Sequence, residues 1–289
     1  MARRGGRRWW DFWLIQAVIC YALYNAFEWV RSQIEGSRVD AIIHARNVIS
    51  AERWLHIFHE ARVEHWIVPC APACNAATVS DLERSAIRFW NVYYGLMHFV
   101  VPALVLIYLY HWHFQRYRLW RNTAGFMLAI SLLGFWLYPV LPPRLLLAHF
   151  GFFDASHFGG IGPIGKAEAG PMSNAYAAMP SLHIGWSTWC ACAAVPVVRN
   201  RVMKVLLILH PIVTFFAVVV TANHYILDGV GGLVTLGLGY LVARAVTAPP
   251  ADVVSKSVRA ASDSSSDPTT TVPLAPESSG RGAPTRRRS

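Results

Sequence analysis

Long apolar segments separated by short polar stretches fill most of the chain. Six of them are long enough for an α-helix to cross a bilayer, at about 20 residues per crossing. These segments lie roughly at Phe12–Val30, Phe89–Tyr110, Ala124–Leu141, Leu182–Val198, Val202–Thr221 and Tyr225–Val246. The last two are nearly continuous, so a tight turn is expected near Asn223. The pattern predicts an all-α fold, a polytopic membrane protein built as a bundle of six transmembrane helices.

Between the first two apolar segments, the stretch from Asp40 to His65 repeats apolar residues at roughly helical spacing. This spacing predicts an amphipathic helix that lies on the outer membrane interface. His56, His59 and Glu60 belong to this stretch. We interpret them as a solvated helix face rather than as metal ligands.

Composition supports a membrane protein. Hydrophobic residues make up 54% of the 289 residues and charged residues only 15%, which is too apolar for an ordinary soluble domain. The segment Phe12–Val30 is too long for the apolar region of a cleavable signal peptide, so it is predicted to be a retained span. After Val246 the sequence becomes a Ser/Thr/Pro/Ala-rich run, so residues 247–289 are predicted to form a disordered tail.

Basic residues predict the orientation of the chain. Four arginines precede the first span, which places the basic N-terminus, residues 1–11, in the cytoplasm. The C-terminal tail then lies on the same side, while residues 31–88, the loop 142–180 and the turn at His224 lie outside. The membrane domain is thus predicted to cover residues 12–246 of a multi-pass plasma-membrane protein. The net charge of +10 suits anionic lipid headgroups better than nucleic acid, and the oligomeric state stays open.

Two cysteines, Cys70 and Cys74, flank Ala-Pro-Ala in the outer segment. A short disulfide and two free thiols fit this arrangement equally well. No histidine or cysteine stands at a suitable spacing beside them, so a zinc site is not predicted.

Three short segments carry the candidate chemistry, each at the outer end of a predicted span. They are LYPVLPPRLL with Arg144, AAMPSLHIGWS with Ser181 and His183, and TANHYILDGVGG with His224 and Asp228. Asp228 follows His224 by four residues, so on a helix both share one face. Ionisable residues at membrane depth are functional candidates by default. Two histidines and an acid in apolar surroundings indicate acid–base or nucleophilic chemistry on a substrate reached from the bilayer.

The local sequence suggests how these segments bind an anion. Pro180 and Ser181 suit the first positions of a helix, Pro as the starter and Ser as the cap. His183 would then lie where free backbone N–H groups attract a phosphate. Arg144, which follows two prolines, offers a charged fork for phosphate oxygens.

The PSLH and HYxxD elements, preceded by PPR, resemble those of the type 2 phosphatidic acid phosphatase superfamily. AAMPSLHIGW and TANHYILDGVGG are similar to its inositol phosphorylceramide synthase-like branch. The resemblance covers residues Phe89–Val246, and the earlier residues only by the number of spans. It implies phosphoryl transfer on a lipid phosphate or phospholipid at the outer face of the membrane, with no metal and no cofactor.

The resemblance also implies a role for each candidate residue. His224 attacks the phosphorus and forms a phosphohistidine, while Asp228 holds its imidazole in the nucleophilic tautomer. His183 protonates the leaving oxygen and then deprotonates the acceptor. Arg144 and Ser181 bind the phosphoryl oxygens.

Four positions depart from the wider superfamily pattern, which has Lys, Pro, Gly and Arg where this chain has Leu137, Leu145, Leu182 and Val218. Two phosphate-binding cations are therefore missing, a gap that the synthase-like branch shares. Lys166 in the outer loop is a candidate for one of these charges, with a solvated loop lysine as the alternative. Asn223 is either a substrate contact or a turn residue between two spans.

The acceptor of the phosphoryl group stays open. Transfer of a phospholipid headgroup onto an alcohol is the first hypothesis. Hydrolysis by water, as in a lipid phosphate or polyprenyl diphosphate phosphatase, is the second. A lipid carrier or flippase is a third, but the His-Asp pair and the lack of an inverted repeat count against it. The missing cations disfavour a vanadium-dependent haloperoxidase.

Overall fold

The computed structural model describes residues 9–34, 36–69, 79–146, 150–154, 174 and 176–247, with side chains from Leu14 onward. Residues 1–247 form one structural unit. Cys70, Cys74 and Lys166 lie outside the described residues, as do residues 1–8 and 248–289. The predictions made for those positions therefore stay predictions.

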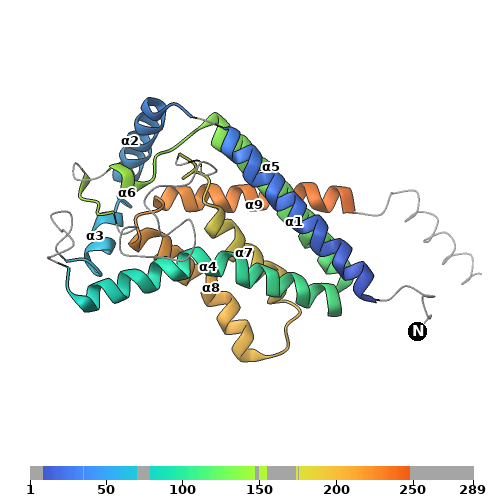
Figure 1. Ribbon diagram of the computed structural model, residues 1–289. Helices are drawn as coiled ribbons and strands as arrows, with labels where there is room; N and C mark the ends of the chain where they lie inside the picture. Colours follow the sequence, from blue (N-terminus) through green and yellow to red (C-terminus); the bar gives the residue numbers. More distant parts are fainter. Residues whose placement is uncertain are drawn as a thin grey trace, which may run out of the picture. The chain divides into compact units, whose positions relative to one another are not determined.

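Within the described residues the chain forms nine α-helices (Figure 1). They are α1 Trp9–Gln33, α2 Arg38–Trp54, α3 Glu60–His65, α4 Asp81–Trp112, α5 Phe114–Leu137, α6 Pro143–Leu146, α7 Leu182–Ala194, α8 Arg201–Val220 and α9 Ile226–Thr247. One isolated β-bridge joins Val140 to Ala177. The all-α prediction is confirmed for this part of the chain.

Six helices coincide with the predicted spans, namely α1, α4, α5, α7, α8 and α9. Among the described helices, α4, α8 and α9 are long and apolar enough to cross a membrane. The helix α7 has 13 residues and ends at Ala194, earlier than predicted, because Pro196 lacks the N–H that would continue it. The tight turn expected near Asn223 is present between α8 and α9.

The long helix α4 starts well before its apolar stretch because its first residues form a capping box. The Ser80 hydroxyl accepts the Glu83 N–H at 3.4 Å, and the Glu83 carboxylate accepts the Ser80 N–H at 2.7 Å. These bonds satisfy N–H groups that a helix start leaves free. They extend α4 to 32 residues.

The predicted amphipathic helix over residues 40–65 is two helices instead of one. The first, α2, ends at Trp54, and the chain turns before α3 begins at Glu60. In this turn His56 takes a φ of 59°, a left-handed conformation that breaks a right-handed helix. Of the apolar residues of α2, Ala41, Ala45, Val48 and Ile49 are buried, whereas Val39, Ile43 and Trp54 are exposed.

Three glutamates in these two helices, Glu52, Glu60 and Glu64, are fully buried. His56 and His59 are exposed, but the solvated-face interpretation is wrong for Glu60. Each of the three carboxylates accepts a backbone N–H from a segment distant in sequence. A local pattern cannot show such partners, which offset the cost of burying the carboxylates.

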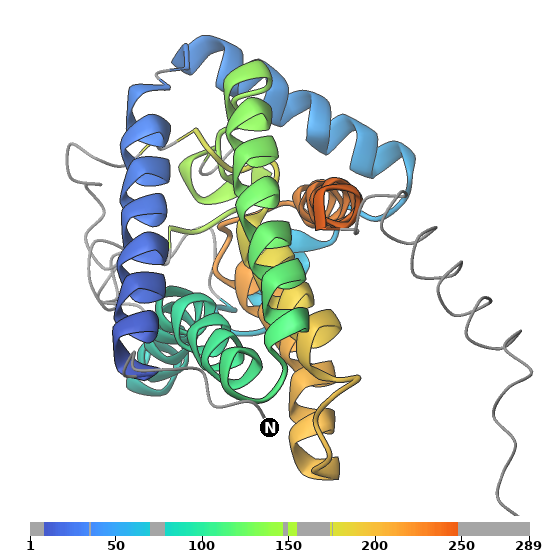
Figure 2. The ribbon, with the colours of Figure 1, turned by 90° about the vertical axis from the view of Figure 1, so that its right-hand side faces the viewer.

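The helices α5 and α9 share the most extensive contact, and α7 packs against both of them as well as against α4 and α8. Figure 2 shows α1 running beside α5. A Cβ added to Gly239 of α9 would lie 2.8 Å from the Met127 backbone nitrogen of α5. Only glycine permits this approach. The largest core cluster lies here, and the fully buried Trp189 donates its Nε1–H to the Trp120 carbonyl at 2.9 Å.

A second core cluster supports the segments that carry the candidate chemistry. It joins α2 to the residues before α6 and before α9, including Ile49, Val140, Leu141, Phe152 and Tyr225. Tyr225 is fully buried, and its hydroxyl donates to the Leu141 carbonyl at 3.0 Å. The turn before α9 is therefore fixed to the segment that leads into α6.

Candidate active site

Backbone hydrogen bonds bring the three predicted segments together. The Arg144 N–H donates to the Ala222 carbonyl at 2.8 Å, and the Ser181 N–H donates to the Asp228 carbonyl at 2.8 Å. The segments that start α6, α7 and α9 therefore meet at one place, although they are far apart in sequence.

The His224 imidazole is held through its Nδ1 atom. This nitrogen lies 2.9 Å from the Ala178 carbonyl oxygen and 3.3 Å from Asp228 Oδ2. Because a carbonyl and a carboxylate only accept, Nδ1 carries a proton, so that in the neutral ring Nε2 keeps its lone pair. Asp228 is fully buried and also accepts the Tyr225 N–H at 3.0 Å. The surroundings thus select the tautomer that a nucleophilic His224 needs.

His183, in the first turn of α7, lies beside His224. The two ring centroids are 5.5 Å apart and the ring planes make an angle of 55°. Tyr94 of α4 stacks on His183 at 4.0 Å, and His98 meets it edge-on at 4.4 Å. His183 Nε2 is buried without a hydrogen-bond partner among the described residues. The two imidazoles are close enough to contact a single tetrahedral anion.

Two side chains orient Arg144 of α6. Its Nε donates to Asn223 Oδ1 at 3.0 Å, and its Nη1 lies 4.0 Å from the Asp154 carboxylate. The Asn223 amide donates to the Thr221 carbonyl at 3.2 Å and to the Thr221 hydroxyl at 2.8 Å. Asn223 thus forms hydrogen bonds with protein partners, which favours its role as a turn residue over direct substrate contact. It also orients the Arg144 side chain.

Ser181 differs from the predicted helix cap. It precedes α7, but its hydroxyl accepts no N–H from the helix, and Pro180 lies before the cap rather than at the first helical position. The Ser181 hydroxyl is buried and has no partner within the described part of the chain. A Cβ on Gly232 of α9 would overlap the Ser181 carbonyl oxygen. The tight contact fixes the Ser181 backbone and leaves its hydroxyl free to bind within the site.

The sequence motifs do not include the aromatic residues of α4 that support His183. Tyr94 and His98 are four residues apart and so share a helix face. The His98 Nδ1–H donates to the Tyr94 carbonyl at 3.0 Å. An ionisable residue inside an apolar span was a usable signal for His98. No comparable sequence signal pointed to Tyr94, because aromatic residues are common in membrane spans.

A further cation, Arg31 in the last turn of α1, was also missed. Its guanidinium group interacts electrostatically with Tyr94, His98 and His183. Its Nη2 pairs with Glu28 at 2.7 Å, while its Nε is buried without a partner among the residues described. No spacing in the sequence connects α1 with the three site segments, so only the packing of α1 shows this charge.

A shallow apolar cavity of about 560 Å³, broadly open to the surface, adjoins the site between α2, α5 and α9. Its lining includes Val48, Leu133, Met179, Pro180 and Leu227. Met179 and Pro180 directly precede Ser181, so one end of the cavity reaches the start of α7.

The family model of the PAP2 superfamily matches residues 46–242, more than half of the chain. The chain belongs to the PAP2 superfamily. Members of this superfamily are in general phosphatases or phosphotransferases that act on lipid phosphates. Searches of curated proteins and of solved structures found no match. The resemblance is confirmed at the level of the superfamily, and the match begins earlier than Phe89, so that it includes Glu52 and Glu60 of the segment between α1 and α4.

Proposed function

We propose that this PAP2 superfamily member carries out metal-independent phosphoryl transfer on a lipid phosphate or phosphodiester, through a phosphohistidine at His224. The proposal rests on the position of the His224 ring. Its Nδ1 atom faces two hydrogen-bond acceptors, and its centroid lies 5.5 Å from the centroid of the His183 ring. An imidazole in this tautomer presents Nε2 as a nucleophile. A second imidazole at this distance can serve the leaving group.

The reaction proceeds in two steps. First, the lone pair of His224 Nε2 forms a bond to phosphorus while the bond to the leaving oxygen breaks, and His183 gives that oxygen a proton. Then the neutral His183 takes the proton of the acceptor O–H, whose oxygen attacks the phosphorus and releases His224. Asp228 stabilises the positive charge on the His224 ring in the first step.

Arg144 and the Ser181 hydroxyl are our choice for the groups that bind the phosphoryl oxygens. Ser181 has a hydroxyl without a protein partner among the described residues, and Arg144 keeps guanidinium N–H groups beyond the Nε that Asn223 occupies. Arg31 adds a positive charge near His183. Lys166 remains a candidate for a further one. Charge-assisted bonds of this kind stabilise the charge that builds on the transferring group.

The apolar cavity beside Pro180 supports a substrate with an apolar chain, which the lining would hold while the phosphate lies at the start of α7. We propose six membrane crossings in the plasma membrane, with both termini cytoplasmic and the site on the outer side, from the distribution of arginines. Headgroup transfer onto an alcohol is the first choice, because the two motifs are similar to the synthase-like branch. Hydrolysis of a lipid phosphate or polyprenyl diphosphate is the alternative.

The nucleophile assignment is tested with the full chain purified into lipid vesicles. With EDTA present, the wild-type protein should release or exchange phosphate from a lipid phosphate, and His224→Ala should reduce this by more than about a thousandfold. Circular dichroism and the unfolding temperature show whether the variant is folded. A folded His224→Ala protein with wild-type turnover would falsify the assignment.

The acceptor is identified by a second assay. A phospholipid labelled in its phosphate is incubated with protein in the presence of water alone, inositol or diacylglycerol, and the labelled products are separated. Headgroup transfer predicts a new labelled lipid that requires the added alcohol. A labelled water-soluble product, the phosphorylated headgroup, formed at the same rate in all three mixtures would instead show hydrolysis by water.

A further inference from the structure

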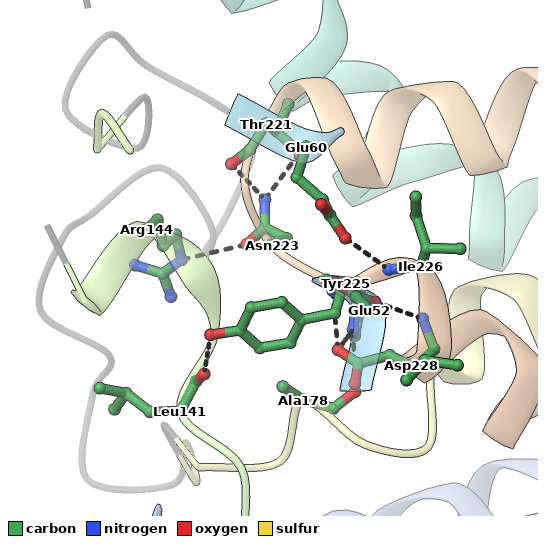
Figure 3. Close-up of polar contacts among 12 residues, drawn as sticks. Glu52, Glu60, Leu141, Arg144, Ala178, Thr221, Asn223, Tyr225, Ile226 and Asp228 are labelled. Carbon is green, nitrogen blue, oxygen red and sulfur yellow. Dashed lines mark hydrogen bonds and ion pairs between the residues drawn. The ribbon is translucent and has the colours of Figure 1, made fainter. Parts of the chain in front are cut away.

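The first backbone N–H groups of α9 are occupied by carboxylates (Figure 3). The Tyr225 N–H donates to Asp228 at 3.0 Å, the Ile226 N–H to Glu60 at 3.0 Å, and the Leu227 N–H to Glu52 at 2.8 Å. Helix starts normally leave these N–H groups for water or a ligand. Here the protein supplies a separate carboxylate for each of three consecutive N–H groups.

Two of these carboxylates come from outside α9 and are fully buried. Glu52 lies near the end of α2, and Glu60 is the first residue of α3. Each uses one oxygen on α9, and the other oxygen, Oε2, is buried without a donor from another described residue. Because they accept the N–H groups of adjacent residues, Ile226 and Leu227, the carboxyl groups of Glu60 and Glu52 lie close to each other. Two ionised carboxylates at such a distance repel each other, so one proton between them is favoured.

The charges around the pair do not offset a second negative charge. Asp228 and Tyr225 face it from the start of α9, and the nearest imidazole to Asp228, that of His224, contacts Asp228 Oδ2 through Nδ1 at 3.3 Å. None of the ion pairs within the described residues involves Glu52 or Glu60. Arg53, next in sequence to Glu52, packs instead over the ring of Phe58 at 5.0 Å.

We propose that Glu52 and Glu60 share one proton and act as positioning residues, which fix the backbone of residues 225–227 and through it the His224 imidazole. The outer segment thereby helps to position the nucleophile of the proposed reaction. The activity measurements below depend on that proposed function. Small displacements of a reacting group can cost up to about a hundredfold in rate. Loss of the Glu52–Glu60 pair should therefore lower the reaction rate measurably.

The shared proton makes this arrangement sensitive to alkaline pH. Burial, and then Glu60 and Asp228, raise the pKa of Glu52 well above its usual range. The folded protein therefore keeps a proton that the unfolded chain loses. This contribution to stability is complete below the ordinary glutamate pKa and is lost as the pH rises through the raised pKa of Glu52.

Substitutions at Glu52 separate the hydrogen bonds from the proton. In Glu52→Gln the amide oxygen still accepts the Leu227 N–H and the amide nitrogen donates to Glu60, without a titrating group. We expect this variant to keep most of the activity at neutral pH and to lose the decline of kcat and of the unfolding temperature at alkaline pH. Glu52→Ala removes the cap and should lower kcat about tenfold with little change in KM.

Glu64 provides the matched control. It is a fully buried glutamate of α3 that accepts the Phe153 N–H at 3.0 Å, and burial raises its pKa to about 8. Because its partner is not in α9, Glu64→Gln should alter the pH dependence of the unfolding temperature but keep the wild-type decline of kcat at alkaline pH. Phe153 precedes Asp154, which faces Arg144, so the shape of the pH profile is compared and not the absolute rate.

The proposal is overturned if Glu52→Gln keeps the wild-type decline at alkaline pH, or if folded Glu52→Ala has wild-type kcat at neutral pH. Failure of the proposed function looks different, because then the wild-type protein is inactive on every lipid phosphate. In that case the unfolding temperatures of the wild type and Glu52→Gln still test the shared proton. Parallel curves across neutral and alkaline pH would refute it.

Discussion

The starts of α7 and α9 each carry one of the two histidines, yet their polar groups are engaged to very different degrees. At α9 the imidazole nitrogen and three consecutive backbone N–H groups all have partners. At α7 the Ser181 hydroxyl and His183 Nε2 are buried without hydrogen-bond partners among the described residues, and His183 is held by ring contacts with Tyr94 and His98.

This difference fits two chemical tasks. A nucleophile benefits from a fixed ring and a fixed tautomer, which the engaged start of α9 provides. An anion needs free donors, and the carboxylates on α9 already occupy the N–H groups that would bind one. The phosphate should therefore bind at the start of α7, where helix N–H groups and the Ser181 hydroxyl remain available.

Replacing His183 should have the largest effect on the α7 side. We expect His183→Gln to lower kcat by about 100-fold to 10,000-fold, the usual contribution of one acid–base group. The loss in the first step should be smaller for a substrate whose leaving group needs no proton. Comparison of kcat/KM, which reports the first step, for a nitrophenyl phosphate ester and a lipid phosphate tests this, and equal losses of kcat/KM on both would contradict the role of His183 as the acid.

Arg144 comes next. Arg144→Ala should lower kcat/KM by about 100-fold, because a charge that binds the phosphoryl oxygens is lost. Arg144→Lys should recover only part of the lost kcat/KM, since an ammonium group cannot form the bidentate contact of a guanidinium group with two phosphoryl oxygens. The unfolding temperature of each variant is the control, and a lysine variant with full activity would argue against a directed guanidinium contact.

The contact between the two helix starts can be broken at Gly232. A methyl group there would overlap the Ser181 carbonyl oxygen, so Gly232→Ala should destabilise the fold by about 1–3 kcal/mol and lower activity as well. Gly237 is the matched control, because a Cβ at this position of the same helix meets nothing within 4 Å. Gly237→Ala should be neutral or stabilising by up to about 1 kcal/mol. Urea or thermal unfolding of both variants measures the difference.

Ser181→Ala should have the smallest effect on activity. We expect kcat/KM to fall about tenfold, the value of one hydrogen bond to a charged group. Stability should stay the same or rise slightly, because the hydroxyl removed has no partner among the described residues. A fall in stability without a change in kcat/KM would show that the hydroxyl serves the fold instead of the substrate.

Much of the fold was predictable because helices and their turns depend on local sequence. The apolar segments located six helices and the turn at Asn223. Contacts between distant segments were not predictable in the same way. Glu60 was taken for a solvated residue, since its partner, the Ile226 N–H, is 166 residues away in sequence.

The site shows the same division. Motif spacing selected His183, His224 and Asp228, which the structure brings together. Arg31 and Tyr94 could not be found from the motifs, because they reach the site through the packing of α1 and α4. The helix start at Ser181 was also misjudged, since a serine before a helix does not by itself show where its hydroxyl points.

The shortness of α7 has a consequence for where the reaction would take place. Its 13 residues give a length of about 20 Å, while the hydrocarbon layer is about 30 Å thick. In the proposed topology, if the C-terminal end of α7 lies at the inner boundary of the hydrocarbon layer, the start of α7 lies about 10 Å below the outer boundary. The reacting phosphate would then have to descend beneath the headgroup plane, and an acceptor dissolved in the lipid would have a shorter route to it than one dissolved in water.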